Sequence, residues 1–113
     1  MPTPGVPPSA PIDVRVFAAG NDLANVLWKK VGGAESYDIQ VNEEATGDSY
    51  GSIKNVSANA PSDQSVKGYD PNTEIGVSIT GLRSSTGYNI RVVAINAHGV
   101  AASEPVYFYY NLY

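Results

Sequence analysis

The run from Leu82 to Asn96 constrains the fold of this chain more than any other stretch of its sequence. A turn at Gly81-Leu82 comes before Thr86, and a long strand follows in which apolar side chains occupy every second position. These alternating residues are Tyr88, Ile90, Val92 and Ala94. Such alternation is typical of a strand with one buried and one solvent-facing side. The turn and the strand together predict a small antiparallel β-sandwich.

Other segments show the same alternation, and no window shows a sustained helical period. Strands are expected near residues 12–16, 24–28, 37–41 and 75–79, with a short strand at residues 50–56. A last strand is expected to start near Ser103, where Pro105 removes a backbone donor and so predicts an edge position. The sequence therefore predicts an all-β domain.

The N-terminal segment differs from the rest of the chain because it is rich in proline. Five of the eight prolines are Pro2, Pro4, Pro7, Pro8 and Pro11. Each proline fixes its φ angle and removes a donor, so an extended lead-in is expected. We interpret residues 1–10 as a Pro-rich interdomain linker, with an ordinary disordered terminus as the alternative. Residues 11–113 then form one domain, as the length predicts.

Composition argues against several classes of function. The chain has no cysteine, which excludes disulfides, thiolate zinc sites and cysteine nucleophiles and leaves the redox compartment open. Its net charge of -4 argues against nucleic acid as a partner. No apolar run approaches the roughly 20 residues of a membrane-spanning helix, so no membrane insertion is expected. The N-terminus also lacks the charged head and apolar stretch of a signal peptide.

Several residues beyond the opening run stand at the spacing of a known family. Trp28, with Val26 before it, occupies the place of a tryptophan in the second strand, and Tyr37 that of a tyrosine opening the third. The corner and the long strand supply Leu82, Thr86, Tyr88, Ile90, Val92, Ala94, Asn96, Gly99 and Ser103. From residue 11 to about 109 the chain thus resembles the fibronectin type III domain. The resemblance implies a seven-stranded antiparallel Greek-key β-sandwich of the immunoglobulin-like superfold.

The chain departs from the family pattern at two places. Ser84 occupies the proline position of the family's Leu-x-Pro-x-Thr-x-Tyr corner, which predicts a looser turn there. Residues 43–74 also form a longer segment than is usual in the family, an extended C to E connection in its strand letters. The arrangement of this segment stays open.

Four large side chains are expected in the core: Trp28, Tyr37, Leu82 and Tyr88. A buried aromatic ring removes about 150–250 Å² from water, which is worth several kcal/mol at about 25 cal/mol per Å² before ordering entropy is deducted. The Tyr88 hydroxyl is expected to bond to backbone a few residues upstream, as in the tyrosine corners of related sandwiches.

The sequence offers little to catalysis. His98 is the only histidine, and it has neither a cysteine partner nor a carboxylate that would orient it. We therefore predict no enzyme activity, no cofactor and no metal site. The acidic residues Glu35, Asp38, Glu43, Glu44 and Asp48 match no calcium-binding loop, so a solvated acidic surface is favoured over a calcium site.

Two further patterns suggest surface features. Asn55 begins an Asn-x-Ser sequon that a eukaryotic secretory pathway could glycosylate. Near the C-terminus, aromatic residues gather at Tyr107, Phe108, Tyr109, Tyr110 and Tyr113. Their outward side chains could dock a neighbouring domain, a partner edge or sugar rings, whereas packing against the adjacent strand and the lead-in is the plainer interpretation.

The residues leave two classes of function in competition. The resemblance implies a recognition or adhesion module of a secreted or surface protein, binding other protein domains through loops or an exposed edge. The candidate contacts are Ala97, His98, Gly99, Val100, Tyr107 and Tyr109. The alternative is a passive spacer, or an accessory domain of a polysaccharide-degrading enzyme with weak carbohydrate binding. A monomeric, extracellular domain is expected, with a cytoplasmic location left open.

Overall fold

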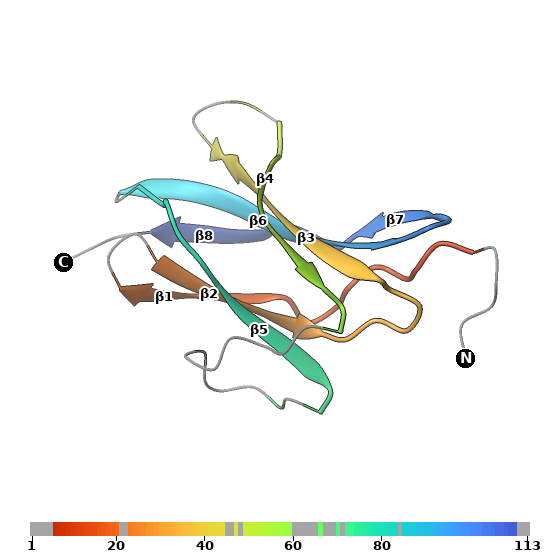
Figure 1. Cartoon of the computed structure of the whole chain (residues 1–113). Helices are drawn as coiled ribbons and strands as arrows, with labels where there is room; N and C mark the ends of the chain where they lie inside the picture. The colour runs from red at the N-terminus through yellow and green to blue at the C-terminus, as the bar shows by residue number, and fades with distance from the viewer. Residues whose placement is uncertain are drawn as a thin grey trace.

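The computed structural model describes residues 6–20, 23–44, 47, 49–59, 66, 70, 72–83 and 85–110. Two antiparallel sheets pack face to face, which confirms the all-β sandwich (Figure 1). The strands are β1 (Arg15–Gly20), β2 (Leu23–Lys29), β3 (Ser36–Glu43), β4 (Gly51–Ser57), β5 (Glu74–Ile79), β6 (Thr86–Asn96), β7 (Gly99–Ala102) and β8 (Val106–Tyr110). In the described part of the chain, no helix has the length and apolarity that crossing a membrane requires.

The two sheets differ in size. The smaller has the order β1-β2-β5, and the larger has the order β4-β3-β6-β7, with β8 also pairing with β6. β6 is the longest strand because its start pairs with β8 and its end pairs with β7. The alternating run recognised in the sequence is therefore the strand around which the larger sheet is organised.

The core lies between the sheets. Its fully buried side chains include Trp28, Tyr37, Ile39, Ile90 and Val92. The rings of Trp28 and Tyr37 meet edge to face, with centroids 5.3 Å apart and an interplanar angle of 62°. This arrangement is one that aromatic pairs favour. The Trp28 indole N–H is buried and finds no hydrogen-bond acceptor among the described residues.

The first strand begins later than its alternation predicts. Ile12 was expected in the strand, yet it lies before β1 and its side chain is 61% exposed. The cause is Asp13, whose φ of 57° is incompatible with an extended strand. Val14 and Val16 still pack against the core, as expected.

The described residues form eight strands where the family resemblance implies seven, because the last strand is interrupted. Ser103, Glu104 and Pro105 separate β7 from β8. Ser103 maintains contact with β6 by a mixed pairing: its N–H donates to the Val92 carbonyl at 2.8 Å, and its Oγ accepts from the Val92 N–H at 2.9 Å. Pro105 has no N–H to continue the ladder, so pairing resumes at Val106.

The long connection contains the predicted short strand, displaced by one residue. β4 spans Gly51–Ser57 and pairs with β3, with a register irregularity between Ile39 and Gln40. Farther along the connection Val66 is buried. Ser84, where a looser corner was expected, lies outside the described residues. So do Asp48, one of the acidic residues, and Tyr113, one of the C-terminal aromatic residues.

Candidate functional site

The side chain of Asn96 ties together three segments at one end of the sandwich. Its Nδ2 donates to the carbonyl of Val6 at 3.0 Å and to that of Gly33 at 3.2 Å. Its Oδ1 accepts from the His98 backbone N–H at 2.8 Å. We call this end the apex, defined by Val6, Gly33 and residues 96–100. One amide thus orders the lead-in, the β2–β3 loop and the β6–β7 turn together.

The lead-in packs closely on the β6–β7 turn. Pro8 is buried, and Pro7 lies so near Gly99 that a Cβ there would come within 3.1 Å of the proline ring. Gly99 also has a φ of 151°, which favours glycine. Residues 6–8, assigned to a linker from the sequence, therefore contact the sandwich.

The apex presents a small, ordered surface. Ala97 and His98 form the two-residue turn between β6 and β7, and both are exposed. Val6 and Val100 are large apolar side chains that are 45% and 62% exposed. Four of the six predicted contact residues, Ala97 to Val100, thus lie together with a residue that the sequence did not suggest, Val6.

The other two predicted contact residues lie elsewhere. Tyr107 and Tyr109 are on β8, which pairs with the start of β6, whereas the apex is at the end of β6. Their side chains are 53% and 50% exposed. The Tyr107 ring covers Gly87, so that a Cβ at this glycine would collide with the ring. The structure therefore separates the tyrosines from the turn residues.

A polar network crosses the outer face of the larger sheet, and sequence reasoning did not find it. The guanidinium carbon of Arg91 lies 3.9 Å from the centre of the Tyr50 ring, and its Nε donates to the Gln40 side chain at 2.8 Å. Gln40 in turn donates to Asp38 at 2.9 Å. These residues come from three different strands or their ends, so only the register of the sheet brings them together.

The acidic residues that the structure describes do not gather at a metal site. Asp38 accepts from Ser52 at 2.6 Å, Glu43 pairs with Arg83, and Glu44 is exposed. No cluster of three or more His, Asp or Glu side chains suited to a metal occurs within the described ranges. The imidazole of His98 has no hydrogen-bond partner there, so nothing positions it as a base.

The four residues expected in the core are buried between the sheets and do not belong to the candidate binding surface. Trp28, Tyr37, Leu82 and Tyr88 are each at most 4% exposed. Each of the two tyrosine hydroxyls accepts a hydrogen bond from a loop backbone N–H. The donor to Tyr37 is Val31, at 2.8 Å, and the donor to Tyr88 is Arg83, at 2.7 Å. Burial raises the pKa of the Tyr37 hydroxyl, and the hydrogen bond from the Val31 N–H opposes this in part.

The sequon residue Asn55 is accessible. It lies on β4 opposite Asp38, and its side chain is exposed. Its Nδ2 makes one long contact of 3.5 Å with the Asp38 carboxylate.

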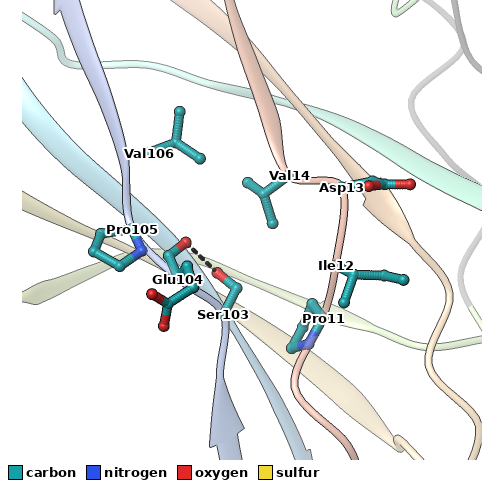
Figure 2. A pocket seen from close by; sticks show the side chains of 8 residues that line it. All are labelled: Pro11, Ile12, Asp13, Val14, Ser103, Glu104, Pro105 and Val106. Carbon is teal, nitrogen blue, oxygen red and sulfur yellow. Dashed lines mark hydrogen bonds between the residues drawn. The ribbon is translucent and has the colours of Figure 1, made fainter.

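A shallow groove of about 290 Å³ lies between the chain entering β1 and the break between β7 and β8. Figure 2 shows Val14 and Val106 facing each other across it, with Pro11 and Pro105 beside them. The groove is mainly apolar, and Glu104 supplies a carboxylate at its rim. The Ser103 hydroxyl also lines the groove, but it donates to the Glu104 backbone carbonyl at 3.1 Å and accepts from the Val92 N–H at 2.9 Å, so these partners are backbone groups and not a carboxylate.

Comparison with known proteins places this geometry in a family. A model of the fibronectin type III domain matches residues 7–109. Among solved structures, the chicken CNTN1 FN1–FN3 domains share 20% identity at a TM-score of 0.73, over 94% of this chain and 32% of that chain. The fn3 domain of human collagen alpha-1(XX) chain shares 17% sequence identity at a TM-score of 0.68, over 100% of this chain and 92% of that chain.

Two further structural neighbours show the same fold. A structure described as a myokine shares 23% identity at a TM-score of 0.66, over 93% of this chain and 99% of that chain. The twitchin kinase region from C. elegans shares 22% sequence identity at a TM-score of 0.66, over 93% of this chain and 17% of that chain. No curated protein was found to be similar in sequence. At these identities the neighbours show the fold alone.

Proposed function

Because this chain belongs to the fibronectin type III domain family, a family of non-catalytic modules common in multidomain proteins, we propose that it is a recognition module that binds a partner protein through the apex. The observation that carries the proposal is the Asn96 side chain, which bonds to Val6, Gly33 and His98 at once. A surface that is already ordered loses less conformational entropy on binding.

The chemistry of the apex suits a protein partner. Val6 and Val100 supply exposed apolar area, and the exposed Ala97–His98 turn adds the imidazole of His98 as a polar group. Binding of this kind needs neither a cofactor nor a metal. We further propose a secreted or cell-surface parent protein, which the accessible Asn55 sequon supports. Family members occur in intracellular proteins as well, so the location is part of the proposal.

The test measures saturable binding of detergent-solubilised cell-surface proteins to the immobilised domain. A double variant, Val6→Ser with Val100→Ser, should lose most of the binding, because it removes the exposed apolar contacts. Phe17→Ser is the matched control, since Phe17 is 56% exposed on β1, away from the apex. Equal loss in both variants, or full retention in the apex variant, would overturn the proposal.

A passive spacer is the second candidate, and the packed lead-in favours it. With Pro8 buried and Pro7 against Gly99, the chain enters the domain in a fixed direction, as a rigid spacer requires. A spacer predicts no saturable binding by the unmodified domain. An accessory role in polysaccharide binding predicts instead that a soluble polysaccharide binds to the unmodified domain. The double variant Tyr107→Ala with Tyr109→Ala should then lose this binding.

A further inference from the structure

The groove lies where the lead-in passes the break between β7 and β8. The lead-in runs beside these strands, because Pro7 lies against Gly99 and the next turn of chain reaches the groove. Residues 11–14 form one wall and residues 103–106 form the other (Figure 2). Within the described part of the chain, no backbone hydrogen bond connects the two walls. The groove is therefore an open seam between two segments that lie side by side.

Local sequence features keep this seam open. Pro11 stands in one wall and Pro105 in the other, and neither has an N–H to donate across the gap. Asp13, with a φ of 57°, interrupts the extended backbone that strand pairing requires. The groove is thus a consequence of residues at fixed positions, and its two walls cannot join into one ladder.

The walls of the groove are mainly apolar. Val14 and Val106 face each other across it, and the rings of Pro11 and Pro105 lie beside them (Figure 2). Ile12, at the same place, is 61% exposed. The volume of about 290 Å³ is near the lower end of the range for ligand pockets, which suits one long side chain better than a larger ligand.

The charge at the groove is negative. Among the described residues that line it, Asp13 and Glu104 are the charged ones, and none is a lysine or arginine. The Asp13 carboxylate already lies 3.6 Å from the Lys29 ammonium group. Glu104 is exposed and forms no ion pair with the residues that the structure describes. A complementary ligand therefore combines an apolar stem with a positively charged end.

We propose that this groove binds an arginine side chain of a partner polypeptide. Its methylene groups lie between Val14 and Val106, and its guanidinium group binds the Glu104 carboxylate at the rim. Long cationic side chains bury their stems along apolar surface while the charged head stays in water. The planar guanidinium group can donate two parallel hydrogen bonds to a carboxylate and is less strongly hydrated than an ammonium group, so arginine is favoured over lysine. This site lies outside the apex.

The test titrates the isotope-labelled domain with blocked tripeptides in which the middle residue, between two glycines, is arginine, norleucine or glutamate. The arginine peptide should shift the amide NMR signals of residues 12–14 and of the non-proline residues in 103–106. Norleucine keeps an apolar stem without the charge and should bind more weakly, and the glutamate peptide should not bind. The apex variant Val6→Ser with Val100→Ser should bind the arginine peptide as the unmodified domain does, which separates this site from the apex.

Variants at Glu104 test the charge. Glu104→Gln should weaken binding of the arginine peptide by about two- to fivefold, the range expected for an exposed ion pair. Glu104→Lys should transfer the preference to the glutamate peptide. Glu44→Gln is the matched control, because Glu44 is also an exposed glutamate but follows β3, on the other side of β6 from β8. Absence of shifts around the groove, equal affinity for the arginine and norleucine peptides, or unchanged affinity in Glu104→Gln would each overturn the proposal.

Discussion

The phenolic oxygen of Tyr88 accepts a hydrogen bond from the backbone N–H of Arg83 at 2.7 Å. The Tyr88 ring is buried between the sheets while its hydroxyl reaches the corner that precedes β6. Core and turn are thereby joined by one side chain. The position of Ser85, whose φ is 56°, shows how sharply the backbone turns just before the strand.

Tyr88→Phe should destabilise the domain by about 1–3 kcal/mol, because the Arg83 N–H loses its acceptor while the packing of the ring is kept. Urea unfolding followed by Trp28 fluorescence measures the difference. Tyr107→Phe is the control, since Tyr107 is half exposed and should show little change. Equal effects in the two variants would mean that the corner hydrogen bond contributes nothing specific.

The acid side of the stability profile should depend on Glu74. The pKa of this carboxyl is lowered from its ordinary value of 4.5. The largest cause is the hydrogen bond that it accepts from the Asp70 backbone N–H at 3.0 Å, and the hydrogen bond and positive charge of Arg15 lower it further. A lowered folded-state pKa contributes stability above the ordinary Glu pKa, and this is lost as pH falls through the folded value. Glu74→Gln should therefore flatten the fall in unfolding free energy below pH 4.5.

Thermal unfolding between neutral pH and the acid range measures this dependence. Glu104→Gln serves as the control, because Glu104 is exposed and forms no ion pair with the described residues. Its profile should follow that of the unmodified domain. A Glu74→Gln profile as steep as the unmodified one would contradict the prediction.

Gly87 and Tyr107 should be energetically coupled. A Cβ at position 87 would collide with the Tyr107 ring, but that ring is half exposed and can move aside. Gly87→Ala alone should therefore cost a modest amount, whereas the same change in a Tyr107→Ala background should cost nothing. A double-mutant cycle should give a coupling of about 0.5–1 kcal/mol. A coupling of zero would mean that the ring does not rest on the glycine in solution.

Much of the sandwich could be predicted from the sequence because its strands alternate plainly. β2, β5 and β6 lie where the period places them, and Trp28 and Tyr88 occupy the core positions that the family spacing implies. The start of β1 could not be predicted from alternation. Ile12 continues the alternating pattern, yet the backbone at Asp13 leaves the extended conformation. The alternation of apolar and polar residues carries no information about the φ angle of a single residue.

The candidate site was predictable only in part, for a similar reason. The turn residues Ala97 and His98 follow the end of an obvious strand, so their exposure could be anticipated. The contact of Asn96 with Val6 could not be anticipated, because the two residues are far apart in the chain and meet only where the lead-in packs against the β6–β7 turn. The stack of Arg91 on Tyr50 likewise depends on the register of β3 with both its neighbours.

Asn96→Asp should release the lead-in while leaving the β6–β7 turn intact. The aspartate keeps an oxygen for the His98 N–H but loses both donors, so that a carboxylate faces the carbonyls of Val6 and Gly33. Hydrogen exchange should quicken in residues 6–12 and around Gly33, with the His98 amide unchanged. Asn55→Asp makes the same change on an exposed strand position and should leave the lead-in alone. Unaltered exchange in residues 6–12 would show that Pro7 and Pro8 hold the segment without Asn96, and the ordering of the apex would then rest on packing alone.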